Sequence, residues 1–407
     1  MQMNRRTLLG TAAGLGAVGL ATPRPGRAQQ NVVKIGVLND QSGPYRDIGG
    51  MLGVAAVKQA VAEFGGGMQI EVVAADHQNK PDIGVGIARQ WFDRDGVDLI
   101  VDVPTSSVAL AINNVAKEKN RAYINTGAAT ADLTGIQCTP CTIHWSYDTY
   151  MLARSTGGAM VAAGGDSWYF VTADYVFGQQ LQRDATQFVT AAGGKVTGAS
   201  LYPFPGTTDF SSFLISAQAS DAKVLGLCNA GADTVNSIKQ AAEFGLTRKM
   251  RIAALLMYIN DVHGLGLEAA QGLYLTESFY WDMNDRTRAF TKRMQARMPA
   301  TTPNMTTAGN YAGTLHFLKA VQDLGIGAKS DGAAVVARMK AMPTEDDAFG
   351  QGSIRADGLA LVPSYLFKVK TPAESKYPWD YFKQVAVTPA DKAWRPLGEG
   401  SCPLVRA

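Results

Sequence analysis

Histidine is scarce in this chain of 407 residues: it occurs four times, at widely separated positions. His77, His144, His263 and His316 have no spacing typical of a metal site or a catalytic dyad. The sequence also lacks the G-x-S-x-G, H-E-x-x-H and P-loop motifs. We therefore predict that the protein is not an enzyme and that it uses no metal or other cofactor.

A large excess of charge of either sign is also missing. The formal net charge is +3, and the first 28 residues contain Arg5, Arg6, Arg24 and Arg27 but no acid. Removing these four positive charges from +3 leaves −1. Because a nearly neutral chain has no general basic surface, we do not expect nucleic acid as a partner.

Long hydrophobic runs are absent after residue 28, where no run approaches the ~18–20 residues that span a bilayer. Residues 1–28 combine Arg5-Arg6, a Gly/Ala/Leu-rich stretch and small residues before Gln29, the pattern of a cleavable export signal. The arginine pair resembles a twin-arginine signal, and an ordinary secretory signal or an uncleaved anchor are the alternatives. We expect cleavage near Ala28 and a periplasmic protein.

Cysteine is limited to Cys138, Cys141, Cys228 and Cys402. Export to an oxidising compartment permits disulfides. Cys228 ends an apolar segment and is predicted to be a buried free thiol. A long-range Cys138–Cys402 bridge and a tight Cys138–Cys141 bridge both fit the sequence, and a redox or metal role of the C-x-x-C pair is the alternative.

The abundant feature is a regular alternation of short apolar runs with helical patterns. Apolar runs typical of buried parallel strands occur at 32–38, 70–75, 98–103 and 121–125. The pattern starts again after Tyr147, with strands expected at 167–172, 195–201, 222–228, 251–256 and 272–276. Two consecutive series of this kind predict an α/β protein with two Rossmann-like lobes, each built on a parallel central sheet.

The pattern changes after Asp285. Helices are expected at 286–298, 307–324 and 332–342, and short strands at 353–355 and 364–369. Helices followed by late strands indicate that the chain crosses back between the lobes and forms no third domain. The proline-rich end of the chain is expected to pack irregularly over the second lobe.

The loops after the expected strands differ between the two halves. In open parallel sheets, a ligand binds beyond the carboxyl ends of the strands. First-half loops such as 105–107 and 125–130 are rich in Ser, Thr and Gly, which suits a carboxylate. Second-half loops offer aromatic and apolar side chains at 175–177 and 257–258. For each loop alone, the alternative is an ordinary helix N-cap.

These loop motifs, in this order, resemble the branched-chain amino-acid-type family of periplasmic binding proteins. The resemblance covers about residues 31–370 and is carried by Ser42-Gly43-Pro44-Tyr45, Thr105-Ser106-Ser107, Asn125-Thr126-Gly127-Ala128, Asp174–Gly178 and Pro205–Phe210. It implies the type I (Venus flytrap) fold with a three-strand hinge whose crossovers lie near 147–148, 278–279 and 349–350. The lobes implied are 31–147 with 280–349, and 148–279 with 350–395, followed by a tail at 396–407.

The resemblance also implies the ligand contacts. Ser107 and Thr126, with the backbone of Ser106, Gly127 and Ala128, are expected to hold a ligand carboxylate. The complete candidate set comes from loops of both lobes and consists of Tyr45, Ser106, Ser107, Thr126, Gly127, Ala128, Tyr147, Tyr175, Phe177, Asn229, Ala230, Gly231, Met257, Tyr258 and Phe279.

One departure from the family pattern bears on the ligand. Amino-acid-binding members place an acidic residue in a second-lobe loop, where it accepts the ligand ammonium. The matching stretch, Leu256-Met257-Tyr258-Ile259, has no acid, and Asp261 just downstream is expected to cap a helix. Because burial of an unpaired ammonium is costly, we expect a ligand without one. The chain is similar to the branch that binds benzoate-, phenylpyruvate- or coumarate-like acids.

The resemblance implies partners as well. The protein is expected to be a monomer that captures a small, aromatic carboxylate by hinge closure and delivers it to an inner-membrane ABC permease. The alternatives are transport of a branched-chain amino acid, another amino acid or an amide, and presentation of the ligand to a signalling receptor.

Overall fold

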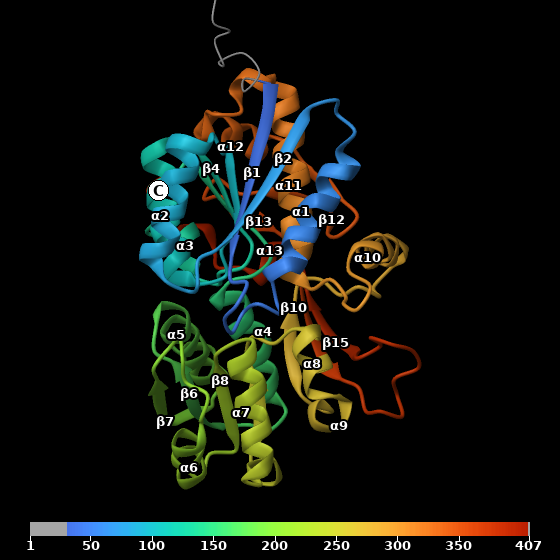
Figure 1. Ribbon diagram of the computed structural model, residues 1–407. Coiled ribbons are helices and arrows are strands. Elements are labelled where there is room, and N and C mark those ends of the chain that lie inside the picture. The colour runs from blue at the N-terminus through green and yellow to red at the C-terminus, as the bar shows by residue number, and fades with distance from the viewer. Residues whose placement is uncertain (1–30, 406–407) are drawn as a thin grey trace, which may run out of the picture.

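The computed structural model describes residues 31–405, which form two α/β lobes arranged one above the other (Figure 1). Each lobe contains a central sheet built mainly from parallel strands, so the predicted fold class is confirmed. No helix in this part of the chain is both long enough and apolar enough to cross a membrane. The expected export signal, residues 1–28, lies outside the described residues.

The first lobe contains an entirely parallel sheet in the order β2-β1-β3-β4-β5. Its central strands are continuously apolar because helices cover both faces. The strands are β1 (Val32–Asn39), β2 (Gln69–Asp76), β3 (Leu99–Asp102), β4 (Ala122–Asn125) and β5 (Thr142–His144).

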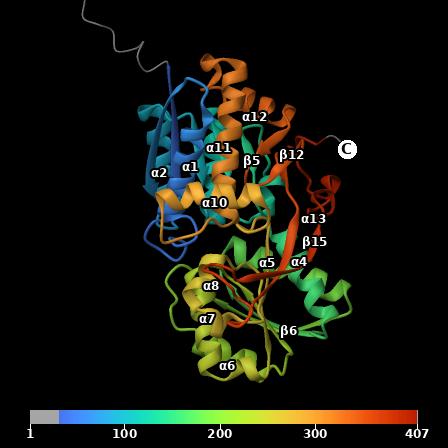
Figure 2. The same ribbon diagram turned by 90° about the vertical axis from the view of Figure 1, so that its right-hand side faces the viewer.

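The helices of the first lobe form a layer on each side of this sheet. Helices α2 and α3 lie on one side, and α1 and α11 pack against each other on the other side (Figure 1). Helix α10 lies at the rim that faces the second lobe (Figure 2). The bounds are α1 (Gly50–Phe64), α2 (Pro81–Gln90), α3 (Ser106–Lys119), α10 (Asp285–Arg297), α11 (Met305–Leu324) and α12 (Gly332–Ala341).

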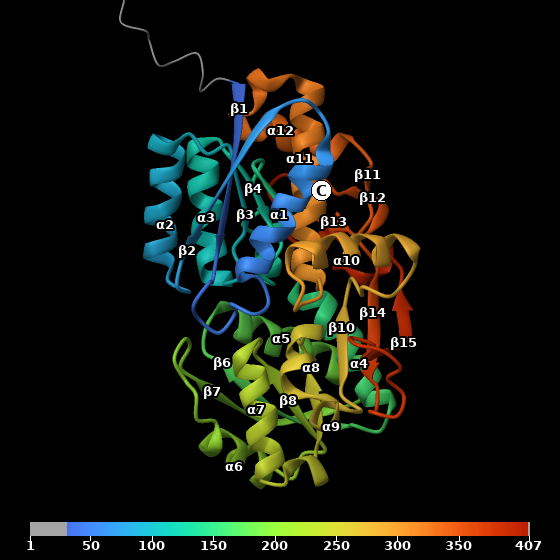
Figure 3. The ribbon, with the colours of Figure 1, turned by 45° about the vertical axis from the view of Figure 1, so that its right-hand side comes forward.

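The second lobe contains a seven-stranded sheet in the order β15-β14-β10-β9-β8-β6-β7. Strands β14 and β15 run antiparallel to their neighbours at one edge, beside β10 (Figure 3). The strands are β6 (Ser167–Ala173), β7 (Lys195–Tyr202), β8 (Val224–Cys228), β9 (Arg251–Ala254), β10 (Tyr274–Glu277), β14 (Ser364–Val369) and β15 (Phe382–Thr388). The helices are α4 (Thr149–Ala162), α5 (Val176–Ala191), α6 (Ser211–Ala219), α7 (Ala232–Glu243), α8 (Ile259–Leu265) and α9 (Leu267–Ala270).

The chain crosses between the lobes three times up to β14 and a fourth time after β15, and the third crossover lies later in the chain than expected. The first two follow β5 and β10, close to the expected positions. The third was expected at 349–350, but β12 (Gly350–Ile354) and β13 (Ala360–Leu361) form a small antiparallel sheet with β11 (Thr344–Asp346). Leu359 bridges to His144 of β5 on the first-lobe side. Residues 350–361 therefore belong with the first lobe, and the chain crosses between β13 and β14.

The end of the chain is more ordered than expected and returns to the first lobe. Part of the proline-rich region forms β15, which pairs with β14, and α13 (Ala390–Ala393) follows. Arg395 then donates a hydrogen bond to the Ala131 carbonyl in the first lobe. Irregular packing over the second lobe was therefore the wrong expectation for this segment.

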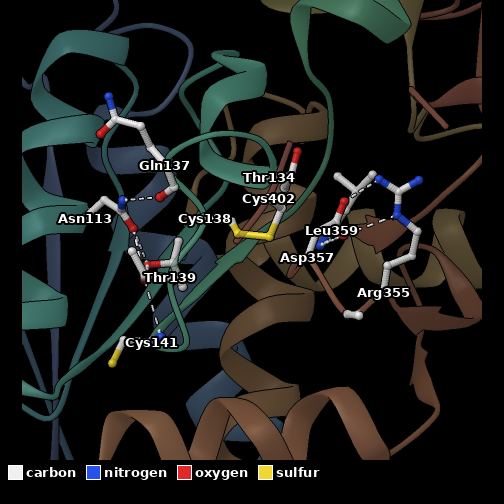
Figure 4. Close-up of a disulfide and its surroundings, with 12 residues drawn as sticks. Asn113, Thr134, Gln137, Cys138, Thr139, Cys141, Arg355, Asp357, Leu359 and Cys402 are labelled. Atoms are coloured by element: carbon white, nitrogen blue, oxygen red, sulfur yellow. Dashed lines mark hydrogen bonds and ion pairs between the residues drawn. A yellow bond between two sulfur atoms is a disulfide. The ribbon is translucent and has the colours of Figure 1, made fainter. Parts of the chain in front are cut away.

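A disulfide between Cys138 and Cys402 holds the tail in this position (Figure 4). The two cysteines are separated by 264 residues, and the bridge lies on the first lobe. Cys141 and Cys228 are buried and free, so the tight Cys138–Cys141 alternative is wrong and the prediction for Cys228 is confirmed. Figure 4 shows the Cys141 side chain directed away from the bridge.

Candidate ligand-binding site

Loops at the carboxyl ends of both sheets meet at the junction of the lobes. The Ala232 backbone N–H of the second lobe donates to the Pro44 carbonyl of the first lobe at 3.0 Å. Gly231 adopts a positive φ of 62°, and a Cβ there would lie 2.4 Å from the Pro44 carbonyl oxygen, so this close approach requires glycine. The side-chain amide of Gln180 also donates across the junction to Asp132. The structure is therefore the closed arrangement of the lobes.

A small cavity remains between the closed lobes. The free volume among its lining side chains is about 10 Å³, which is room for one water molecule, so the side chains or the lobes must move apart to admit a ligand. Its lining comes from both lobes and from the first crossover: Tyr45, Ile48, Pro104, Gly127, Ala129, Tyr147, Tyr175, Phe177, Ala230, Leu256 and Tyr258.

Two tyrosines from opposite lobes meet at one side of the cavity. The hydroxyls of Tyr45 and Tyr175 are 2.6 Å apart, and either can be the donor. Phe204 stacks on both rings, with centroid distances of 5.5 Å to Tyr45 and 4.4 Å to Tyr175. Because one hydrogen suffices for the bond within the pair, the other hydroxyl hydrogen is available to a ligand.

Two further tyrosines form a hydrogen-bonded chain at another side of the cavity. The Tyr258 hydroxyl donates to the Tyr147 hydroxyl, which donates to the Gly127 carbonyl. The Thr306 hydroxyl lies 3.5 Å from both tyrosine oxygens. Both phenolic hydrogens are already used, so these tyrosines offer a ligand aromatic surface and oxygen lone pairs but no free O–H.

The lining carries no ionisable acid or base apart from these tyrosines: no Lys, Arg, His, Asp or Glu is among the described residues around the cavity. Two buried carboxyls lie just behind the walls. Burial raises the pKa of Asp102 to about 6, although hydrogen bonds from Asn39 and Asn310 stabilise the charged form and lower the pKa in part. Burial also raises the pKa of Asp233 to about 6, against a hydrogen bond from the Tyr202 hydroxyl.

Seven of the fifteen sequence-predicted site residues line the cavity. They come from the first-lobe loops, the first crossover and the second-lobe loops, and they are Tyr45, Gly127, Tyr147, Tyr175, Phe177, Ala230 and Tyr258. These residues share a position at the carboxyl end of a parallel strand, where the topology brings loops of both sheets together.

The other predicted residues lie near the cavity or away from it. The Thr126 hydroxyl donates to Asn310, so it is engaged within the first lobe. Asn229 bonds to Thr234 and Ser237 of its own lobe, and its neighbour Gly231 contacts the Pro44 loop. Ser107 and Ala128 do not line the cavity either.

Met257 and Phe279 are packed into hydrophobic cores, so the structure does not place their side chains in the cavity. Met257 is fully buried in the core of the second lobe. The Phe279 ring packs edge-on against Phe290 and Phe349 beside the second crossover. The hydrophobic character that made both residues candidates serves packing instead.

Ser106 differs from the other serine and threonine candidates. Its hydroxyl is buried at the first turn of α3 and has no hydrogen-bond partner among the described residues. Sequence reasoning gave the side-chain role to Ser107, the more exposed of the two. Ser106 is therefore the serine of this loop with an unused buried donor.

Sequence reasoning missed four residues of the lining and the acid that lies behind it. Ile48, Pro104, Ala129 and Leu256 supply apolar surface but carry no polar signal in the sequence. Asp102 ends β3, shortly before the Thr105-Ser106-Ser107 loop. An acidic residue at the end of an apolar run was the sequence signal for a buried carboxyl at this position.

The acids nearest to the second-lobe loops have structural roles. Asp261 accepts a hydrogen bond from the Tyr258 backbone N–H and caps α8, as predicted. Glu277 at the end of β10 accepts from Ile259 and Met305, the first residues of α8 and α11. Within residues 31–405, no group of three or more His, Cys, Asp or Glu is arranged to hold a metal ion.

A second, wider hollow lies at the opposite edge of the second-lobe sheet and is open to solvent. Its charged lining includes Lys223, Arg248, Lys249 and Arg251. The interlobe cavity is the better candidate site because both lobes enclose it and because it lies at the strand ends where ligands of such sheets bind.

Two α/β lobes closed around a small cavity, with several passages of the chain between them, define a bilobed ligand-binding protein. The comparison with protein families agrees: residues 32–376 match the family described as periplasmic binding protein. The chain belongs to this family.

Several proteins are similar to this chain over most of its length. A periplasmic binding protein from Burkholderia mallei is 48% identical, with a TM-score of 0.88 and coverage of 92% of this chain and 100% of that chain. A branched chain amino acid ABC transporter periplasmic ligand-binding protein from Burkholderia xenovorans LB400 is 37% identical, with a TM-score of 0.79 and coverage of 91% and 99%.

More distant similarities show the fold or cover part of the chain. The Leu/Ile/Val-binding protein homolog 4 of Brucella abortus is 25% identical over 256 residues, which are 60% of this chain and 61% of that protein. A solute binding protein from R. palustris, solved in complex with benzoate, is 20% identical, with a TM-score of 0.79 and coverage of 88% and 97%.

Proposed function

We propose that this protein is the extracytoplasmic solute-binding component of an ABC importer and that it captures a small aromatic carboxylate between its lobes. The observation that carries the proposal is the composition of the cavity wall. Within residues 31–405, five aromatic side chains and no acid, lysine, arginine or histidine line it. Such a wall stabilises a ring by burial and leaves an ammonium group without a counter-charge.

The hydrogen-bonding groups around the cavity support an acidic group at one end of the ligand. The Tyr45–Tyr175 pair has one hydroxyl hydrogen to give, and hydrogen bonds to a charged oxygen are the stronger kind. Benzoate is bound by the R. palustris protein, whose 20% identity supports a shared fold and leaves the ligand to be argued from the cavity.

A branched-chain amino acid is the rival ligand, because the Burkholderia xenovorans relative carries that description. The cavity of this chain argues against it, since among the described residues no carboxylate lines the wall, and the Asp102 carboxyl lies behind Gly127. Asp261, the acid closest to the matching loop, is engaged in capping α8.

Closure of the lobes is the mechanism that we propose for capture. Contacts from both lobes would stabilise the closed form when the ligand is present, and this form would dock on an inner-membrane permease in the periplasm. Delivery to a signalling receptor is the alternative. The genes beside this one test delivery: permease and ATPase genes would support transport, and a kinase gene would favour the receptor.

A thermal-shift panel tests the ligand class. The mature protein would be heated with benzoate, 4-hydroxybenzoate, phenylpyruvate, coumarate, leucine, valine and benzamide, because a ligand that binds the folded state raises Tm. We expect the aromatic acids to raise Tm and the amino acids to leave it unchanged. A shift with leucine and none with any aromatic acid would contradict the proposal.

A further inference from the structure

Asp102 lies directly behind the first-lobe wall of the cavity. It ends β3, is fully buried, and adopts a positive φ of 88°. Its Oδ2 accepts hydrogen bonds from the side-chain amides of Asn39 and Asn310, both at 2.9 Å. Its Oδ1 has no partner and would lie 2.8 Å from a Cβ on Gly127, a residue that lines the cavity.

Among the described residues, no lysine, arginine, histidine or second acid faces this carboxyl, and the titratable side chains near it are Tyr123 and Tyr147, whose pKa values burial and the Asp102 charge raise, so both are neutral. Asn39 of β1 and Asn310 of α11 donate hydrogen bonds to it. Gly49, just before α1, and Gly53 in its first turn lie against it. The loop after β4 presents Gly127. Among the described residues, Asp102 forms no ion pair with a lysine, arginine or histidine, and its surroundings donate only amide N–H groups.

An anion in the cavity would therefore lie close to a carboxyl that has no counter-charge. Two negative charges in one poorly solvated site repel each other strongly, and the usual result is that one of them takes up a proton. The unpaired Oδ1 is the atom that can accept this proton, since Oδ2 already receives two hydrogen bonds.

We propose that Asp102 takes up one proton from solvent when an anionic ligand enters the cavity, so that the site holds the anion beside a neutral carboxyl. The proton binds at Oδ1, and it is released again when the anion leaves. This inference rests on the proposed function, because it requires an anionic ligand. Asp102 thereby makes the affinity of the site for anions higher at low pH than at high pH.

The coupling predicts a particular pH profile. Burial places the pKa of Asp102 near 6 without ligand, so the carboxyl is mostly charged at pH 7 to 8 and must gain a proton on binding. By linkage, the Kd of benzoate should then rise by up to about tenfold per pH unit above pH 6. Below about pH 5, the carboxyl is already neutral and Kd should become independent of pH.

Isothermal titration calorimetry measures this uptake directly. Benzoate would be titrated into the mature protein at pH 7 in phosphate and in Tris, whose ionisation enthalpies differ. We expect uptake of nearly one proton per benzoate at pH 7 and of almost none at pH 5. Benzamide, a neutral probe of similar shape, should produce no uptake at either pH.

The variant Asp102→Asn assigns the proton to its site. An asparagine oxygen can still accept from Asn39 and Asn310, so we expect benzoate binding without proton uptake and with a flat pH profile. Asp346→Asn is the matched control, because Asp346 is buried with a pKa also raised to about 6 but lies in the β11–β12 turn. It should behave as the unmodified protein.

The outcomes separate this inference from the proposed function. Binding of benzoate without uptake at pH 7, or uptake that survives Asp102→Asn, would overturn the role of Asp102. Uptake abolished by Asp233→Asn and retained in Asp102→Asn would place the proton on the second-lobe wall and would equally overturn it. If no aromatic acid binds at all, the proposed function itself fails.

Discussion

The two lobes build different walls around the same cavity. The first lobe contributes the small residues Pro104, Gly127 and Ala129 beside Tyr45 and Ile48. The second lobe contributes the rings of Tyr175, Phe177 and Tyr258 beside Ala230 and Leu256. Small residues are thus concentrated in the first wall and aromatic rings in the second, and both walls offer apolar contact.

The lobes also differ in how they are held together. The first lobe carries the Cys138–Cys402 bridge, which ties the end of the chain to it, whereas the one cysteine of the second lobe, Cys228, is a buried thiol. Behind each wall, however, lies one buried carboxyl, Asp102 or Asp233. The two walls therefore differ in the size of their side chains. They are alike in that a buried carboxyl without a cationic partner among the described residues lies behind each.

Loss of the disulfide should produce the largest effect and fall on the first lobe. Replacing Cys138 and Cys402 by Ser opens a link across 264 residues, and we expect the free energy of unfolding to fall by about 4 kcal/mol. Chemical denaturation with and without the bridge measures the change. Cys141→Ser, in the same lobe but outside the bridge, is the control. An equal fall in the free energy of unfolding in this variant would show that the disulfide is not the cause.

The buried carboxyl of the first wall should make stability depend on pH. The pKa of Asp102 is raised from the model-peptide value of 3.8 to about 6, so its neutral form is favoured in the folded state. Its stabilising contribution is complete below about pH 4 and is lost as pH rises through 6, amounting to about 3 kcal/mol. Relative to the unmodified protein, Asp102→Asn should therefore gain stability from pH 4 to pH 8.

Urea unfolding at several pH values measures this difference between the two proteins. The comparison with Asp102→Asn removes the contributions of all other titrating groups, which the proteins share. A difference that stays constant from pH 4 to pH 8 would contradict the raised pKa of Asp102.

Enlarging the small wall should remove ligand binding. In Gly127→Ala, the new Cβ would lie 2.7 Å from the Pro104 Cα and 2.8 Å from the Asp102 Oδ1, so the wall must move. We expect benzoate affinity to fall about 100-fold, or about 2.8 kcal/mol. Gly158→Ala is the control, because a Cβ there meets no atom within 4 Å in helix α4, and its Kd should be unchanged. An unaltered Kd in Gly127→Ala would contradict the placement of the ligand against this wall.

Removing one hydroxyl from the aromatic wall should have a smaller effect. Tyr175→Phe retains the ring that stacks on Phe204 but removes one of the two hydroxyls, so that the unpaired Tyr45 hydroxyl is the one left to donate to the ligand. We expect benzoate to bind about 30-fold more weakly, or about 2 kcal/mol. Tyr169→Phe, whose hydroxyl bonds to Ser200 in the second-lobe sheet, is the matched control. Equal Kd values for both variants would count against Tyr175 as a donor.

The sequence was sufficient for the fold because the main strands are continuous apolar runs between helices. The β1 run, for example, is buried along nearly its whole length, and the structure places β1 within one residue of the predicted segment. The late strands were harder to predict. Strands β11, β12 and β13 are short and pair only with one another, and β15 is an exposed edge strand, so none of them has the pattern of a central strand.

The site was predictable in position but only partly in its residues. Topology places the loops at strand ends, and the family resemblance selected Tyr45, Tyr147 and Tyr175 from them; all three line the cavity. The direction of a side chain depends on partners far away in the sequence. Thr126 donates to Asn310, 184 residues later, and no local sequence pattern predicts that hydrogen bond.

A crystal structure of the mature protein with benzoate tests the central claim most directly. The account predicts electron density for the ring between Gly127 and the Tyr175–Phe177 wall, with the carboxylate within hydrogen-bonding distance of the Tyr45–Tyr175 hydroxyl pair. Benzoate bound in the wide hollow beside Arg248, or a closed cavity left empty at saturating benzoate, would contradict it.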